Sequence, residues 1–118
     1  MEIEHYNNLL ELFYNQYKQE RSDKVFLQSL KDPNQKLTWE QIYLNILKLS
    51  DRLESLMQSH DRCLLISENR PEWMVSDLAI MLANGITVPA YTTYTERDYE
   101  YLIDDCKPSV IILSLIHI

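Results

Sequence analysis

The sequence SENRPEW, residues Ser67–Trp73, leads through a helical stretch into NGITVPAYTTYT, residues Asn84–Thr95, and these two stretches decide the fold. Pro71 suits the first turn of a helix, where the missing N–H of proline costs nothing. From Trp73 to Leu82 this helix is apolar on nearly all sides, which is typical of a helix covered on most of its surface. Asn84-Gly85 predicts a left-handed end to the helix.

Short apolar runs on either side of this helix predict two strands, Arg62–Ile66 and Ile86–Ala90. Pro89 cannot donate a hydrogen bond to a neighbouring strand, so the second strand is expected to end there or to lie at a sheet edge. Thr95 is expected to cap a further helix over residues 96–106, which ends at Lys107-Pro108. Its predicted inward side chains are Tyr99, Leu102, Ile103 and Cys106.

A last apolar run, Ser109–Leu113, predicts a final strand that is buried on both faces. Helices and strands then alternate along the second half of the chain. Such alternation favours a parallel sheet with helices on both faces and right-handed crossovers. The predicted fold class is α/β: a partial doubly wound, mainly parallel sheet, preceded by an N-terminal helix and a β-hairpin.

The first part of the chain supplies that helix and hairpin. Residues 3–20 have the spacing of an amphipathic helix, and residues 25–27 and 36–38 flank a turn that contains Pro33 and Asn34. Thr38-Trp39-Glu40-Gln41 is a capping-box pattern, which predicts the start of a long helix that reaches about Gln58. The buried stripe of this helix is expected to be Ile42, Ile46, Leu49, Leu53 and Leu56.

Composition and charge limit the classes of function. The chain has 118 residues and a net charge of −7 at pH 7. A surface of that sign repels the phosphate backbone, so nucleic acid is not expected as a partner. No apolar run approaches the roughly 20 residues that cross a membrane, and the acidic start Met1–His5 does not have the order of a signal peptide. We therefore expect no transmembrane segment and a cytoplasmic protein.

Glycine and cysteine usage limit the chemistry further. Gly85 is the only glycine, whereas phosphate-binding loops need several so that the backbone can approach the anion. Cys63 and Cys106 each lie within an apolar pattern, which favours buried, reduced thiols over a disulfide or a metal pair. The sequence has neither the Cys-x-x-Cys nor the His-rich spacing of a metal site.

The sequences of Ser67–Trp73 and Asn84–Thr95, together with Thr38-Trp39 at the start of a long helix, closely resemble the N-terminal part of AMP-forming acyl-CoA synthetases, especially the long-chain fatty acid type. The resemblance covers roughly residues 5–112. It implies that residues 1–118 are an incomplete N-terminal subdomain of an AMP-binding domain. The full-length parent would use a fatty acid, ATP with Mg²⁺, and CoA, and the remainder of its own polypeptide would be the partner of this segment.

The chemical motifs of that family do not occur in this sequence. The glycine-rich Ser/Thr phosphate loop with its lysine is absent, as are the adenine, ribose and hinge motifs and the catalytic lysine. The resemblance therefore places no catalytic, cofactor-binding or metal-binding residue on this chain. It predicts that the parent is a ligase and that the 118-residue chain by itself is inactive.

Five residues are candidates for a substrate channel or a subunit interface: Asn69, Arg70, Trp73, Tyr91 and Tyr94. The two tyrosines follow a strand end, where open α/β sheets bind ligands, and could line an acyl or CoA entrance. The alternative is structural: Asn69 shapes a turn, Arg70 pairs with a carboxylate, and the aromatic rings pack.

Glu68 and Glu72 flank the start of the helix that Pro71 opens. Two nearby carboxylates could act as an acid–base pair. We interpret them instead as groups that cap the helix and favour its positive end.

The end of the sequence has a different character. Residues 113–118, LSLIHI, resemble the translated end of a transposon-based sequencing adapter, so we expect that this tail is artefactual. A genuine strand with an unusual tail is the alternative.

Two other functions remain open at this point. One is a freestanding flavodoxin-like α/β binding or regulatory module, although the strand ends lack the acidic cluster of a receiver domain and the phosphate loop of a flavin binder. The other is a fragment of a different adenylate-forming enzyme, such as an aryl-CoA ligase or an adenylation domain.

Overall fold

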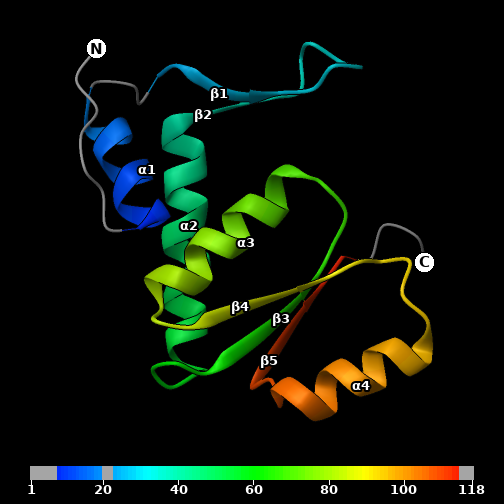
Figure 1. Ribbon diagram of the computed structural model, residues 1–118. Coiled ribbons are helices and arrows are strands. Elements are labelled where there is room, and N and C mark those ends of the chain that lie inside the picture. The colour runs from blue at the N-terminus through cyan, green and yellow to red at the C-terminus, as the bar shows by residue number, and fades with distance from the viewer. Residues whose placement is uncertain (1–7, 20–22, 115–118) are drawn as a thin grey trace.

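The computed structural model describes residues 8–19 and 23–114, and its second half is built around a parallel sheet (Figure 1). In this part of the chain β3 (Arg62–Ile66) is the central strand, between β4 (Ile86–Ala90) and β5 (Val110–Leu113). Helix α3 (Pro71–Leu82) covers one face and α4 (Glu96–Cys106) the other. The predicted parallel sheet with helices on both faces is confirmed, and so is the edge position of the strand that contains Pro89.

The central strand is the most buried element. Cys63, Leu64 and Leu65 have no exposed surface. Cys63 belongs to the core that α3 shares with the N-terminal helices, and Leu64 belongs to the smaller cluster under α4. Alternate residues of β3 thus serve two cores, which is why the sequence is apolar without interruption.

The prediction that the last strand is buried on both faces is wrong. In β5, Ile111 and Leu113 are about half exposed, at 47% and 52%. They are register partners of Leu64 and Ile66, so they point to the face that α4 covers. Helix α4 lies over β3 and β4 and does not reach across β5, because its packed residues contact the side chains of those two strands.

Helix α4 follows its prediction with one exception. A capping box between Thr95 and Asp98 begins it, and Cys106 is buried. Tyr99 and Leu102 pack on the sheet, but Ile103 is 39% exposed and the prediction that it faces inward is wrong. The reason is the same narrow contact: only one row of α4 meets the sheet.

Helix α3 begins with Pro71 in its first turn and ends at Asn84-Gly85, as predicted. The left-handed residue is Asn84, with φ of 61°, while Gly85 has no positive φ. The N–H of Asn84 donates to the carbonyl of Met81 and the N–H of Gly85 to that of Ile80, which satisfies two free carbonyls. Space is tight at Gly85, because a Cβ there would lie 2.8 Å from the Met57 methyl and 3.0 Å from the Ile80 Cγ2, so these side chains would have to move.

Helix α2 (Trp39–Glu54) begins with the predicted capping box. It ends four residues before the expected Gln58, because the Ser55 hydroxyl and N–H both bond to the Arg52 carbonyl and tighten the last turn. As a result Leu56 is 55% exposed, so its predicted place in the buried stripe is wrong, and Met57 is buried instead. Of the other predicted residues, Ile42, Ile46 and Leu53 are buried and Leu49 is partly buried.

The N-terminal region packs on α2 through aromatic rings. Helix α1 (Leu9–Lys18) begins where the Asn8 side chain accepts the N–H of Glu11. Residues 3–7 and residue 20 of the predicted helix lie outside the described residues. Strands β1 (Val25–Gln28) and β2 (Lys36–Thr38) form the predicted hairpin.

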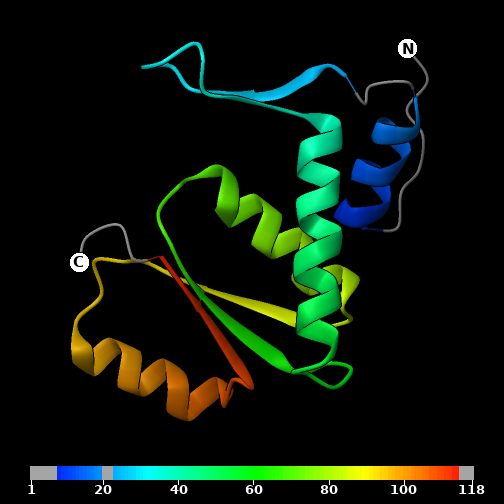
Figure 2. The ribbon, with the colours of Figure 1, turned by 180° about the vertical axis from the view of Figure 1, so that it is seen from behind.

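The hairpin is held at its base by the Phe13 ring of α1, whose centroid is 5.8 Å from that of Phe26 and 5.4 Å from that of Trp39. Its other end projects away from the sheet (Figure 2), and Leu30 there is fully exposed.

The end of the chain is described as far as Ser114, so residues 115–118 of the predicted artefactual tail lie outside the described residues. Leu113 is the last residue of β5, and the N–H of Ser114 donates to the Ile66 carbonyl.

Asp61 lies at the amino-terminal ends of the parallel strands. Its carboxylate accepts hydrogen bonds from the N–H of Gln58 and from the Ser109 hydroxyl, at 2.9 and 2.8 Å. These two donors hold the pKa of Asp61 below its ordinary value.

The two residues that end α3 can be separated by substitution. Gly85→Ala is expected to lower the free energy of unfolding by about 1 kcal/mol or more, because the new methyl group collides with Met57 and Ile80. The matched change Asn84→Gly should alter it by less than about 0.5 kcal/mol, since glycine accepts a positive φ. Urea unfolding followed by circular dichroism measures both, and equal losses would contradict the steric argument.

The Asp61 contacts predict a pH dependence. A carboxyl group whose pKa is lower in the folded chain stabilises it above the unfolded pKa of about 4 and loses that effect as pH falls through the folded pKa. The stability difference between the wild type and Asp61→Asn should therefore be constant between about pH 7 and 5 and shrink toward pH 3. Urea midpoints across this range test it, and a difference independent of pH would refute it. Ser109→Ala, which removes one donor, should show a smaller effect of the same sign.

Candidate functional site

The two stretches that decide the fold meet in space. The loop after β3 and the loop after β4 begin side by side at the carboxyl ends of the strands, because parallel strands end on the same side of the sheet (Figure 1). Between them lies a cavity of about 600 Å³, here called the strand-end cavity. Its lining residues are Ser67, Glu68, Asn69, Trp73, Pro89, Ala90, Tyr91, Thr92, Thr93 and Tyr94.

Four of the five candidate residues line the strand-end cavity: Asn69, Trp73, Tyr91 and Tyr94. Tyr91 is 70% exposed and Tyr94 36%, and their rings meet edge to face with centroids 5.4 Å apart. Trp73 is partly buried. The structure therefore brings these side chains from two distant parts of the sequence to one place.

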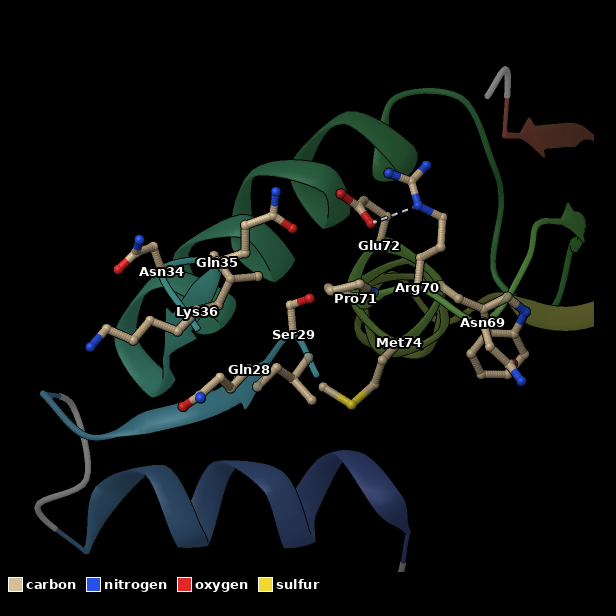
Figure 3. Close-up of a pocket in the computed structure, with 13 residues that line it drawn as sticks. Gln28, Ser29, Asn34, Gln35, Lys36, Asn69, Arg70, Pro71, Glu72 and Met74 are labelled. Carbon is tan, nitrogen blue, oxygen red and sulfur yellow. Dashed lines mark ion pairs between the residues drawn. The ribbon is translucent and has the colours of Figure 1, made fainter. Parts of the chain in front are cut away.

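Arg70 faces a second, larger cavity of about 810 Å³ between the hairpin and the start of α3, here called the hairpin cavity. Figure 3 shows Ser29 and Gln35 from the hairpin side, opposite Pro71 and Glu72 at the start of α3. Asn69 and Trp73 line both cavities. The sequence did not predict that the hairpin residues line a cavity, since the pattern of a polar two-stranded hairpin does not indicate which element it will lie opposite.

The contacts of Arg70 agree with the structural alternative. Its Nε lies 3.6 Å from a carboxylate oxygen of Glu72, and its Nη1 donates to the Ser114 hydroxyl at 3.5 Å. Arg70 is also the N-cap residue of α3, with no capping hydrogen bond from its side chain. Glu72 lies in the first turn of α3, where the helix dipole favours a negative charge, in agreement with the interpretation that it favours the positive end of the helix.

The strand-end cavity does not suit phosphate groups. Its lining contains one carboxylate, from Glu68, and no lysine or arginine. The single glycine, Gly85, precedes β4 and so lies at the amino-terminal ends of the strands, away from this cavity, where it contacts Met57. A phosphate needs cationic side chains or closely spaced backbone N–H groups. The lining of the strand-end cavity therefore does not fit the triphosphate of ATP.

The two cysteines take no part in either cavity. Both are free thiols and buried, as predicted. Burial raises the pKa of Cys63 to about 11, which keeps it protonated and unreactive at neutral pH. Within residues 8–19 and 23–114 no group of three or more His, Cys, Asp or Glu side chains is arranged to hold a metal ion. In the same residues, no helix has the length and apolar character needed to span a bilayer.

Comparison with known proteins defines the class. The family model for AMP-binding enzymes matches residues 13–117, so the chain belongs to the AMP-binding enzyme family. Among curated proteins it is 36% identical over 78 residues to a long-chain-fatty-acid–CoA ligase of Bacillus subtilis, which covers 65% of this chain and 14% of that protein. It is 33% identical over 95 residues to the peroxisomal acyl-CoA ligase 891 of Penicillium roqueforti, which covers 74% of this chain and 13% of that protein.

The fold also matches solved structures. The crystal structure of the anthranilate CoA ligase AuaEII in complex with anthranoyl-AMP superposes with a TM-score of 0.79 and 23% identity, over 94% of this chain and 21% of that one. At this identity the likeness concerns the fold. The chain spans about one seventh of the length of the curated relatives named above.

Arg70 and Trp73 should differ in how much each contributes to the free energy of unfolding. Arg70→Gln is expected to change the free energy of unfolding by less than about 1 kcal/mol, because its ion pair is long and exposed. Trp73→Ala, three residues on, should cost about 2 kcal/mol or more through lost packing of a partly buried ring. Urea unfolding of both variants tests this. A larger loss for Arg70→Gln would show that Arg70 has a structural role beyond these contacts.

Proposed function

We propose that this chain is the N-terminal part of a cytoplasmic, ATP-dependent long-chain fatty acid–CoA ligase. The parent would join a fatty acid to AMP with release of pyrophosphate, and then transfer the acyl group to the thiol of CoA. Membership of the AMP-binding family supports the class of reaction. The name of the Bacillus subtilis relative, the fatty acid ligase to which the chain is 36% identical, supports the substrate.

The two-step reaction has a chemical reason. A carboxylate is a poor electrophile, and adenylation gives it a good leaving group. Magnesium and basic groups would stabilise the negative charge that develops on the phosphates. The lining of the strand-end cavity has no basic group for that task, and the sequence has no glycine-rich phosphate loop, so we assign it to the remainder of the parent polypeptide. Residues 1–118 would then form an incomplete N-terminal subdomain of the AMP-binding domain.

The observation that carries the proposal is the strand-end cavity. It is lined by the two stretches that resemble acyl-CoA synthetases, and it lies at the carboxyl ends of parallel strands. Its aromatic rings and hydroxyl groups suit an uncharged part of a substrate better than a phosphate. We propose that Asn69, Trp73, Tyr91 and Tyr94 supply one wall of a substrate channel there, and that Arg70 lies beside it.

An aryl acid is the second candidate substrate, and the similarity in fold to an anthranilate CoA ligase favours it. That similarity is 23% in sequence, below the identity to the fatty acid ligase. We therefore place the long-chain acid first.

Acid-dependent exchange between ATP and pyrophosphate tests the proposal. The full-length protein that carries this segment should catalyse exchange with palmitate more efficiently than with benzoate or anthranilate. The 118-residue chain should give no exchange above background, because it has no phosphate loop and no catalytic lysine. Exchange by the 118-residue chain would refute the assignment of catalysis to the remainder. A preference of the full-length protein for aryl acids would favour the second substrate. If the full-length protein gave no exchange with any acid, the proposal that it is an acid–CoA ligase would be refuted.

A further inference from the structure

The turn that forms one wall of the strand-end cavity is held from outside the cavity. The Tyr91 carbonyl accepts the N–H of Tyr94, which closes a turn over residues 91–94, but this hydrogen bond is long at 3.4 Å. The same carbonyl accepts the Tyr99 hydroxyl at 2.5 Å. The shorter bond comes from α4, eight residues further along the chain, and ties the turn back to that helix.

Tyr99 itself is firmly placed. The capping box of Thr95 and Asp98 fixes the start of α4, and the N–H of Tyr99 donates to the Thr95 carbonyl within the first helical turn. Its side chain packs against the cluster formed by Leu64, Ile66 and Ala90 on the sheet. The hydroxyl is therefore presented to the turn by a side chain that is anchored on both the helix and the sheet.

The three rings form a continuous row. The Tyr94 centroid lies 5.4 Å from that of Tyr91 and 5.9 Å from that of Tyr99. Tyr91 and Tyr94 line the strand-end cavity, whereas Tyr99 does not. A displacement of the Tyr91 carbonyl would therefore move both lining rings, since Tyr91 and Tyr94 belong to the turn that this carbonyl closes.

We propose that Tyr99 is a positioning residue: its hydroxyl holds the turn over residues 91–94 so that Tyr91 and Tyr94 form the wall of a site for an uncharged chain of a substrate. The inference rests on the proposed function. The lining of this cavity has no lysine or arginine to pair with an anionic group, and its aromatic rings and hydroxyl groups suit an uncharged part of a substrate. Two substrates of the proposed reaction carry such a chain: the acid in its hydrocarbon tail, and CoA in its pantetheine arm.

The test is Tyr99→Phe in the full-length protein, with Tyr101→Phe as the matched control. Phenylalanine keeps the ring and its packing and removes only the hydroxyl. Tyr101 lies on the same helix, is 71% exposed and does not line the cavity. We expect Tyr99→Phe to raise the KM of one substrate by roughly 2- to 10-fold, the loss of about one hydrogen bond, with kcat within twofold of the wild type. Tyr101→Phe should change neither constant.

Each result has a definite meaning. A higher KM for palmitate assigns the site to the acyl chain, and a higher KM for CoA assigns it to the pantetheine arm. Unchanged KM values for both substrates would overturn the proposal. So would a loss of kcat that parallels a loss of thermal stability, since that pattern belongs to a purely structural residue.

A second measurement separates this inference from the proposed function. Chymotrypsin cleavage after Tyr91 and Tyr94, located by mass spectrometry, reports how well the turn is held and needs no enzymatic activity. If the full-length protein activates no acid, the proposed function fails. Faster cleavage in Tyr99→Phe than in Tyr101→Phe would still support the tether, and equal rates would overturn it.

Discussion

The described part of this protein depends on the burial of one strand from both sides. β3 has three consecutive side chains without exposed surface, and its alternate residues belong to two separate cores. Because the strand pairs with β4 on one edge and with β5 on the other, its backbone groups bond to both neighbours. Helices α3 and α4 take their positions from the two rows of side chains that β3 presents. Helix α2 packs against α3, α1 contacts both of these helices, and the hairpin lies against α2.

The position of the candidate site follows from this arrangement. In a parallel sheet the carboxyl ends of all strands lie on the same side. The loops after β3 and β4 are therefore neighbours, although the polypeptide passes through α3 between them. The loops are polar and aromatic where the strands are aliphatic, and the change in composition occurs at the point where the chain leaves the sheet. Core and cavity thus meet at the end of β4, where Ala90 belongs to the smaller core and also lines the cavity, while Tyr91–Tyr94 of the following loop line the cavity alone. A substitution in the loops can therefore alter the cavity without a large effect on the core.

The elements were predictable where a local interaction decides them. The capping box at Thr38, proline in the first turn of α3 and the Asn-Gly end of that helix depend on residues within a few positions of one another. The errors concern residues whose environment is set by distant parts of the chain. Ile103, Ile111 and Leu113 are apolar and periodic in sequence, and they are exposed because α4 covers only two of the three strands of the parallel sheet. Leu56 is exposed because α2 ends early, and Met57 takes the buried position near Gly85.

The candidate site divides in the same way. Sequence patterns alone determined the order of helices and strands, the absence of a glycine-rich phosphate loop and the choice of Asn69, Arg70, Trp73, Tyr91 and Tyr94, because residue type and short-range spacing control these properties. Only the tertiary structure decided that four of them line one cavity while Arg70 faces another, and that Tyr99 bonds to the turn at Tyr91. The physical reason is that a cavity and a tether join groups whose separation depends on sheet register and helix packing, and neither is encoded in the spacing of residues along the chain.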